Sequence, residues 1–387
     1  MSLFSGSKAD LRMLNSHFYN VNGDSNNIFS LQNFLKILVA HCLFQFNRNL
    51  VQIPVFNLET GPYIAVHSNT FVFCGPVFKV SGVTKSIHFT GNTLITNSHI
   101  QTFSLESNTA AIYIVANQFL RQDNDDATNF PVSQLKILDS NSPSQDVLIQ
   151  DNQFVSLYGQ TGIVMITGGS TPYAVNLVNN IFINNIASSN GGALYLQTNI
   201  DGSRASFQNC DFILNNASSG KGGAIYQTSP NLLSQNTTIS SSIFVNNSAS
   251  LTGGAIFFDY SLPNIIADQT SIFLENQAQR PNHVGSYPVQ LVFSNATDYN
   301  DTLYIPGLTP FQPNTSLSSN SSYKISNIGS GVETKDHLAF VILDMFGQRF
   351  DSDDTSTLEI YPSGYNTTTA RSSFSTFSPS AIWNVYP

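Results

Sequence analysis

The chain has 387 residues, of which 41% are hydrophobic and only 10% are charged, and its formal net charge is −9. The hydrophobic content is enough to form a core, and the length allows two domains. The sequence has no run of basic residues and no nucleic-acid motif, which argues against nucleic-acid binding. The longest apolar stretch, 35–46, contains Lys36 and His41 and is far too short to span a bilayer.

A short pattern recurs at intervals of 23 to 35 residues over the first three quarters of the chain. Most copies have two apolar residues at alternate positions, although this pair fades in the last copies to Thr237/Ile239 and Ile266/Asp268. Every copy then has a small polar residue and, two positions later, an aromatic residue or Leu. The ten residues at this last position are Phe18, Phe44, Phe71, Leu94, Phe119, Phe154, Phe182, Phe212, Phe244 and Phe273. Alternation with period two indicates strands, and a fixed period of this length is typical of a solenoid.

We therefore predict an all-β parallel β-helix of about ten coils over residues 1–285, with three short strands per coil. Stacked strands lie ~4.8 Å apart, which gives a rod roughly 45–50 Å long. Apolar runs that follow the aromatic residue, such as 71–73 and 212–214, are expected to be core strands. A further strand is expected in each coil, for example at 192–195, 223–226 and 254–257.

The small polar residue of the pattern forms the most specific column of the repeat. Asn tolerates the left-handed backbone conformation that a tight bend requires. Asparagines stacked in one bend can also hydrogen-bond above and below, which satisfies amides that are costly to bury. We predict such a ladder at Asn69, Asn92, Asn117, Asn152 and Asn180, with Ser16, Cys42, Cys210, Ser242 and Ser271 at the equivalent positions.

Cysteine and histidine residues form no recognisable site in the sequence, and no metal or cofactor is predicted. Three cysteines do not support a disulfide framework, and we expect free thiols at Cys42, Cys74 and Cys210. Histidines occur in early coils at different offsets from the aromatic position, so we do not expect one column of His17, His41, His67 and His88.

The N-terminal residues 1–10 lack the apolar core of a signal peptide. The first coil begins near Leu11 with no room for a cap, and an open solenoid end exposes strand edges and an apolar face. We expect the chain to be a piece of a longer protein, and end-to-end stacking with another β-helix segment is one candidate interaction.

The solenoid pattern ends near residue 285, and the region 286–387 is rich in Ser, Thr, Asn and Pro. Strand-like runs occur at 289–293, 338–343 and 357–360, and an Asp-x-x-Gly turn begins at Asp344. A strand, this turn and a strand resemble the hairpin of immunoglobulin-like modules of surface proteins. We interpret this region as a small β-sandwich-like domain that can be incomplete at Pro387. The alternative is a flexible, glycosylated Ser/Thr/Asn-rich stalk.

A second signature is clearest within residues 175–285. Phe-x-x-Asn ends at Asn185, Asn215, Asn247 and Asn276, and the first three copies are each followed by Gly-Gly-Ala-Leu/Ile at 191–194, 222–225 and 253–256. This pairing resembles the repeats of chlamydial polymorphic outer-membrane proteins and of large surface proteins of ciliates and other protists. The resemblance implies a right-handed, pectin-lyase-like β-helix at a cell surface, with an adhesive or structural role. The glycines and asparagines themselves are interpreted as turn formers.

The sequence also contains Asn-x-Ser/Thr sequons, which are N-glycosylation acceptors in secreted eukaryotic proteins. The Asn-rich composition and the sandwich-like tail favour a protist glycoprotein, in which some of these sites are modified. The candidate residues are Asn216, Asn236, Asn246, Asn295, Asn300, Asn314, Asn320 and Asn366.

Polysaccharide lyases and hydrolases also use the β-helix fold, and fold does not decide function. Carboxylates that converge on a bond are required for such chemistry. The alternative catalytic or Ca²⁺ site is the acidic loop with Asp123, Asp125 and Asp126, near Arg121. A further acidic cluster comprises Asp351, Asp353 and Asp354. Both clusters are also explained as solvated loops.

The leading hypothesis is a non-enzymatic cell-surface or extracellular repeat protein that serves as an adhesin, a recognition module or a scaffold. Its partner would be a glycan or a surface-protein ligand. Exposed aromatic side chains are the candidates for contact: Tyr158, Tyr195, Tyr226 and Tyr260.

Overall fold

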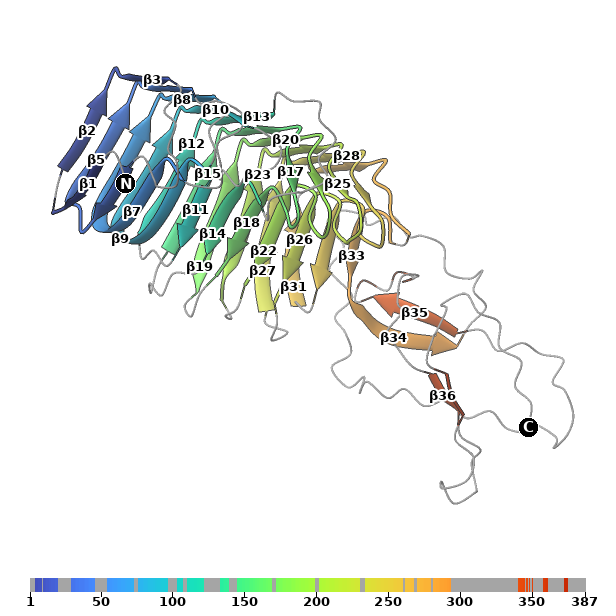
Figure 1. Ribbon diagram of the computed structural model, residues 1–387. Coiled ribbons are helices and arrows are strands. Elements are labelled where there is room, and N and C mark those ends of the chain that lie inside the picture. Colours follow the sequence, from blue (N-terminus) through green and yellow to red (C-terminus); the bar gives the residue numbers. More distant parts are fainter. Residues whose placement is uncertain are drawn as a thin grey trace, which may run out of the picture.

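The computed structural model is all-β in the part of the chain that it describes, and its parallel strands stack as a β-solenoid (Figure 1). The described residues are 4–8, 10–19, 29–45, 54–72, 76–96, 103–106, 110–121, 133–138, 145–168, 172–198, 202–229, 234–259, 262–267, 270–279, 281–293, 340–344, 346, 348, 350, 358–360 and 372–374.

Three rows of parallel strands form the walls of the solenoid. The first row contains β1 (Phe4–Ser7), β4 (Phe29–Gln32), β7 (Phe56–His67), β9 (Phe78–Thr90), β11 (Phe103–Glu106), β14 (Leu135–Leu138), β18 (Val164–Thr167), β22 (Leu194–Gln197), β26 (Ile225–Thr228), β30 (Ile256–Asp259) and β33 (Val284–Ser286). The second row contains β2 (Asp10–Leu14), β5 (Lys36–Ala40), β12 (Ala111–Val115), β15 (Gln145–Gln150), β19 (Tyr173–Val178), β23 (Arg204–Gln208), β27 (Ser234–Ser240) and β31 (Leu262–Ala267). The long strands β7 and β9 turn the corner and join both rows into one sheet.

The third row is a separate ten-stranded sheet that carries the aromatic position of the sequence pattern. Its strands are β3 (His17–Tyr19), β6 (Leu43–Gln45), β8 (Thr70–Val72), β10 (Thr93–Thr96), β13 (Gln118–Arg121), β16 (Gln153–Val155), β20 (Ile181–Ile183), β24 (Asp211–Ile213), β28 (Ile243–Val245) and β32 (Ile272–Leu274). The register pairs Phe154 with Phe182 and Phe182 with Phe212, so the repeat positions form one column, and the predicted β-helix is confirmed.

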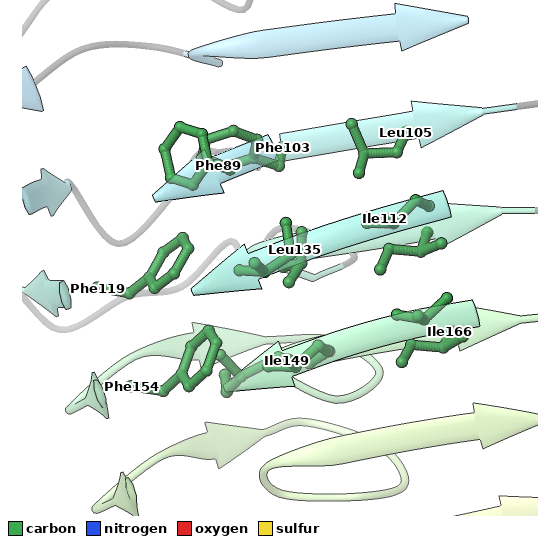
Figure 2. Packing of buried hydrophobic residues seen from close by; sticks show 14 of the residues in the cluster. Phe89, Phe103, Leu105, Ile112, Phe119, Leu135, Ile149, Phe154 and Ile166 are labelled. Carbon is green, nitrogen blue, oxygen red and sulfur yellow. The ribbon is translucent and has the colours of Figure 1, made fainter. Parts of the chain in front are cut away.

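Aromatic and aliphatic side chains from all three rows fill the core (Figure 2). Within the column, the rings of Phe119 and Phe154 stack with centroids 4.7 Å apart, and those of Phe154 and Phe182 also stack at 4.7 Å. Figure 2 shows Phe119 beside Leu135, and Phe154 beside Ile149, from the other rows. Each fully buried side chain of this size contributes about 2–3 kcal/mol.

A buried ladder of asparagine side chains lines the bend between the second and third rows. Asn117 Nδ2 donates to Asn152 Oδ1 over 3.0 Å and to the Phe89 carbonyl over 2.9 Å. The same exchange links Asn69 to Asn92 and Asn152 to Asn180. Each amide therefore bonds a neighbouring coil, and none of these donors is left unsatisfied by burial.

The left-handed residue of the bend is not the ladder asparagine, as the sequence suggested, but the residue before it. Ser68, Ala116 and Asp151 have φ of 53°, 54° and 55°, and each precedes a ladder asparagine. The ladder side chain points inward because the preceding residue has already turned the chain. Any exposed small or polar residue can fill the turning position, which explains its variety.

One interpretation of the apolar runs needs correction. In the three-residue strands of the third row, only the middle residue points inward, as Phe212 does in β24. Ile213 points outward, and Leu214 is 51% exposed at a left-handed bend with φ of 57°. The run 212–214 therefore supplies one core residue rather than a core strand, because alternation sends its neighbours to the other face.

Part of the C-terminal region packs on the last coil. β34 (Pro288–Phe293) pairs antiparallel with β35 (Phe340–Asp344), and β36 (Leu358–Ile360) pairs with β37 (Ser372–Phe374). The predicted hairpin from 338–343 to 357–360 is therefore wrong, because each of these strands pairs elsewhere. Most of 286–387 lies outside the described residues, and the β-sandwich and the domain boundary stay predictions.

The predicted turn at Asp344 anchors this segment to the solenoid. The buried carboxylate accepts hydrogen bonds from the backbone N–H groups of Ser286, Phe346 and Gln348, and from Gln348 Nε2. Gln348 Nε2 also donates to the Val284 carbonyl over 2.8 Å, and Phe346 packs on the core cluster. Residues 343, 344, 346, 348 and 350 thus cover part of the C-terminal end of the core.

Candidate binding surface

The Phe-x-x-Asn motif builds a second buried ladder at the bend that follows the third row. Asn215 Nδ2 donates to Asn247 Oδ1 over 3.0 Å and to the Phe182 carbonyl over 3.0 Å. Asn185 and Asn276 extend the ladder on either side. These asparagines are not the turn formers that the sequence suggested, because the left-handed φ again belongs to the preceding residue, such as Asn184 at 54°.

The Gly-Gly motif removes side chains where two parts of neighbouring coils touch. A Cβ on Gly223 would lie 2.0 Å from the Gly254 carbonyl oxygen, and a Cβ on Gly192 would lie 2.1 Å from that of Gly223. Gly222, before Gly223, has φ of 69°. The backbone therefore packs directly against a fourth row of two-residue strands: β17 (Tyr158–Gly159), β21 (Ile186–Ala187), β25 (Asn216–Ala217) and β29 (Ser248–Ala249).

A row of aromatic residues lies on the outward side of the first row, directly after each Gly-Gly motif. We call Tyr195, Tyr226 and Phe257 the aromatic row. The Tyr195 and Tyr226 rings stack with centroids 5.2 Å apart, and those of Tyr226 and Phe257 are 6.0 Å apart. Because the rings face one another along the rod, little of the row is exposed: Tyr195 is half-buried, and Tyr226 and Phe257 are buried.

Polar side chains accompany the aromatic row two positions further along each strand. The Tyr226 hydroxyl donates a short hydrogen bond to Asp259 Oδ2, and the Tyr195 hydroxyl lies 3.3 Å from Gln197 Oε1. Thr228 stands between Gln197 and Asp259 in the register. Hydroxyl, amide and carboxylate groups therefore follow one another from coil to coil.

Burial and the Asp259 carboxylate control the ionisation of this row. Burial, reinforced by Asp259, raises the pKa of Tyr226 far above its usual range, so its hydroxyl stays a donor. The same two causes raise the pKa of Tyr195. Lys221 Nζ lies 4.7 Å from the centroid of the Phe257 ring, which is a cation–π contact at one end of the row.

Comparison with known protein families identifies the type of repeat that contains the aromatic row. The model of the Chlamydia polymorphic membrane protein repeat matches residues 181–197, 212–228 and 241–259. Residues 181–259 therefore contain repeats of the polymorphic membrane protein type. No curated protein and no solved structure matches the chain. Each matched segment contains one asparagine of the second ladder and one glycine pair. The resemblance to the chlamydial repeats is therefore confirmed.

The four tyrosine candidates lie in different environments around these polymorphic membrane protein repeats. Tyr195 is half-buried, whereas Tyr226 is only 6% exposed, so it is not an exposed contact residue. Tyr158 lies in the fourth row, where the Arg121 guanidinium sits 4.0 Å from its ring centroid. Tyr260 lies outside the described residues. Only Tyr195 combines the aromatic row with an accessible side chain.

A second aromatic cluster lies on the outward side of the second row, before the polymorphic membrane protein repeats. The rings of His88 and Tyr113 stack with centroids 4.6 Å apart, and Tyr63 lies 5.6 Å from His88. Lys36 Nζ lies 5.2 Å from the centroid of Tyr63. Sequence analysis missed this cluster, although the outward positions of adjacent strands would have aligned these residues.

Histidines do not assemble into a metal centre in the described part of the chain. His88 pairs in register with Ala65, and His67 pairs with Ala40, so the two imidazoles occupy different columns. Burial, with a smaller effect of a neighbouring histidine, lowers the pKa of both. No group of three His, Cys, Asp or Glu side chains within ligand geometry occurs among these residues.

The remaining predicted sites are tested only in part. The acidic residues Asp123, Asp125 and Asp126, and the cluster Asp351, Asp353 and Asp354, lie outside the described residues. Cys42 and Cys210 are free and buried in the first ladder, whereas Cys74 is not described. No helix in the described part of the chain is long and apolar enough to cross a membrane.

Three sequons fall on described residues. Asn246 is exposed at a left-handed bend, and Asn236 is exposed on the second row. Asn216 is half-buried, and its Oδ1 accepts a hydrogen bond from Ser248 Oγ over 3.0 Å. Glycosylation of these residues stays a prediction, and the other five sequons, Asn295, Asn300, Asn314, Asn320 and Asn366, lie outside the described residues.

Proposed function

We propose that the chain is a non-enzymatic surface repeat protein whose solenoid is a rigid rod that presents a recognition face. Both the parallel solenoid fold and the polymorphic membrane protein repeats fit a surface repeat protein. The inward ladder asparagines and the glycine pairs already hydrogen-bond to or pack against neighbouring coils. Recognition therefore falls to outward side chains, and a cell-surface or extracellular location suits this role.

The single observation that carries the recognition role is the aromatic row with its polar companions. Tyr195, Gln197 and Thr228 are all half-buried on the outward side of the matched repeats. Their hydroxyl and amide groups can both donate and accept hydrogen bonds, as sugar hydroxyls require. Because the groups recur with each coil, about every 4.8 Å, an extended glycan is the ligand class that fits best.

The test is a glycan-array screen of the whole chain, followed by mass spectrometry of the bound sugars. Tyr195→Ala is expected to weaken binding at least tenfold. Tyr113→Ala, which removes an outward stacked ring from a coil before the repeats, is the matched control and leaves binding unchanged. Equal loss in both variants, or no loss in either, would reject the aromatic row as the site.

The same experiment addresses the enzymatic alternative at Asp123, Asp125 and Asp126. Bound sugars of unchanged mass support recognition without turnover. Cleaved or unsaturated products that disappear in an Asp125→Ala/Asp126→Ala variant would overturn the proposal and assign a polysaccharide-active enzyme. Labelling of intact producing cells with a reagent that does not cross membranes tests the surface location.

A further inference from the structure

An aliphatic strip runs along the outward side of the third row. The third residue of each strand from β8 to β32 points outward, and in every case it is Val, Ile or Leu. The parallel register aligns these residues in one column: Val72, Ile95, Leu120, Val155, Ile183, Ile213, Val245 and Leu274. β10 and β13 continue for one further residue beyond this column.

The strip widens toward the C-terminal end of the solenoid. There the first residue of a strand is also aliphatic in β20, β28 and β32, and Ile272 and Leu274 are 49% and 52% exposed. Leu214, in the left-handed bend beside β24, is 51% exposed. Isolated exposed apolar residues are ordinary, but a contiguous apolar patch on a soluble surface marks an interaction site.

We propose that this aliphatic strip is the interface between two copies of the chain, packed face to face through their third rows. This inference is independent of the ligand proposed above. Its first support is spacing, because side chains in the strip recur about every 4.8 Å. Only a partner with the same spacing packs along the whole strip, and a second copy supplies that partner.

The area of the aliphatic strip is the second argument that its partner is another copy of the chain. Eight strands about 4.8 Å apart make the strip roughly 40 Å long, and three residues with their flanking bends make it roughly 20 Å wide. The resulting area of roughly 800 Å² per copy is what a standard protein–protein interface buries on each side. Two sheets packed in this way lie about 10 Å apart, as in a β-sandwich.

The borders of the strip are mostly polar, as an interface rim requires. Along one bend, Asn179 Nδ2 donates to Asp151 Oδ1 over 2.9 Å, and Asn209 Nδ2 donates to Asn179 Oδ1 over 3.2 Å. Along the other bend, Asn184 Nδ2 donates to Ser156 Oγ over 3.2 Å. A membrane-binding face instead carries many Trp, Lys and Arg residues at its edge. These described borders carry mainly amides, hydroxyls and carboxylates, and Arg121, at the end of β13, lies over the Tyr158 ring.

The position of Asp211 selects one arrangement of the two copies. Asp211 is the first residue of β24 and lies among aliphatic neighbours. A two-fold axis parallel to the strands, midway between β16 and β20, places β24 opposite the partner's β13. Asp211 then meets the exposed amide of Gln118 in the partner copy. An axis along the rod would instead place this carboxylate against Ile213 of the other copy and leave it unpaired, which is unfavourable.

The test is the mass of the whole chain in solution, measured by sedimentation over a range of concentrations. We expect a monomer–dimer equilibrium that Ile183→Lys shifts to at least tenfold higher concentration, because each lysine would be buried against the partner's Val155 with the second lysine one strand away. Ile183→Thr, which keeps β-branching, shifts it in the same direction. Ser206→Lys, on the outward side of the second row, leaves the equilibrium unchanged.

Cross-linking tests the arrangement itself. A mixture of Val155→Cys and Ile183→Cys chains, both in a Cys74→Ser background, is expected to form mixed dimers with a short bis-maleimide reagent. A chain that remains monomeric at its highest soluble concentration would overturn the proposal. Co-flotation with phosphatidylcholine vesicles that is abolished by Ile183→Lys would also overturn it and assign the strip to a lipid surface.

Discussion

The early coils, from β2 to β16, and the repeat coils, from β20 to β32, share the first asparagine ladder column and the column of stacked aromatic rings. The repeat coils add the second ladder and the glycine pairs, and they contain three of the four described strands of the fourth row. This difference indicates that the residues of the family signature are those that pack neighbouring coils together. It describes how the backbone of one coil approaches the next, and the candidate contact residues lie beside the signature rather than within it.

The largest expected effect comes from refilling the space that glycine leaves. In Gly223→Ala the new Cβ would lie 2.0 Å from a backbone carbonyl oxygen, so the coils must separate. We expect a loss of about 4 kcal/mol in the free energy of unfolding, measured with urea. Gly91→Ala in the early coils is the control, because its nearest contact is 3.6 Å, and only its φ of 64° opposes the change. A loss of about 1 kcal/mol is expected there, and equal losses would contradict a packing role for the repeat glycines.

The two ladders can be compared by removing one amide from each. Asn152→Ala and Asn215→Ala each leave buried backbone groups without partners, and each is expected to cost about 3 kcal/mol in urea unfolding. Cys210→Asn restores the amide where the first ladder changes to sulfur, so it is expected to stabilise the fold by about 1 kcal/mol. A destabilising effect of Cys210→Asn would show that the column does not accept an amide there.

The docked segment 340–350 depends on the Asp344 carboxylate. In Asp344→Asn an N–H group replaces one accepting oxygen, and we expect about 2 kcal/mol less protection of the Gln348 amide in hydrogen exchange. Glu275→Gln, at an exposed bend of the last repeat, is the matched control and is expected to leave this protection unchanged.

The docking of this segment is also expected to depend on pH. Burial raises the pKa of Asp344 to about 7, while the four donors around it oppose this rise. A carboxyl with a raised folded-state pKa stabilises the fold most below its unfolded pKa of about 4, and this contribution is lost as the pH rises to about 7. Protection factors are therefore expected to fall between these values in the native chain and to stay flat in Asp344→Asn. A rise over this range would contradict the expectation.

The smallest effect concerns the aromatic row. Tyr226→Phe removes the donor to Asp259 and is expected to cost about 1.5 kcal/mol in the free energy of unfolding. Tyr113→Phe, in the outward stack of the early coils, is expected to change stability by less than about 0.5 kcal/mol. Ultraviolet titration should also show tyrosines that do not ionise in the native fold at pH 10, because burial raises the pKa of Tyr173 as well as that of Tyr226. Tyr226→Phe is expected to reduce the number of these protected tyrosines by one, and an unchanged number would contradict the buried hydrogen bond to Asp259.

The sequence pattern predicted the inward side of the solenoid well, because burial imposes the alternation that the pattern records. Phe154 and Asn152 were both placed by their offsets alone. The outward side was harder, since a run such as 181–183 is apolar at all three positions and periodicity does not separate its faces. The turning residue was missed for a related reason. A left-handed bend constrains backbone conformation more than side-chain type. Residues at this position, such as Ala116 and Asp151, therefore share no residue type that a sequence pattern would reveal.

Both asparagine ladders run in one direction. In every hydrogen bond between ladder side chains, Nδ2 donates to the Oδ1 of the coil that follows, from Asn69 to Asn180 and again from Asn185 to Asn276. The side-chain dipoles therefore add along the rod and polarise one another, with the positive end toward the C-terminal coils. At that end Asn276 Nδ2 lies 3.3 Å from His283 Nδ1, and burial lowers the pKa of this imidazole. A neutral imidazole that accepts this hydrogen bond continues the dipole direction of the ladder, whereas a positively charged group at this end would oppose it.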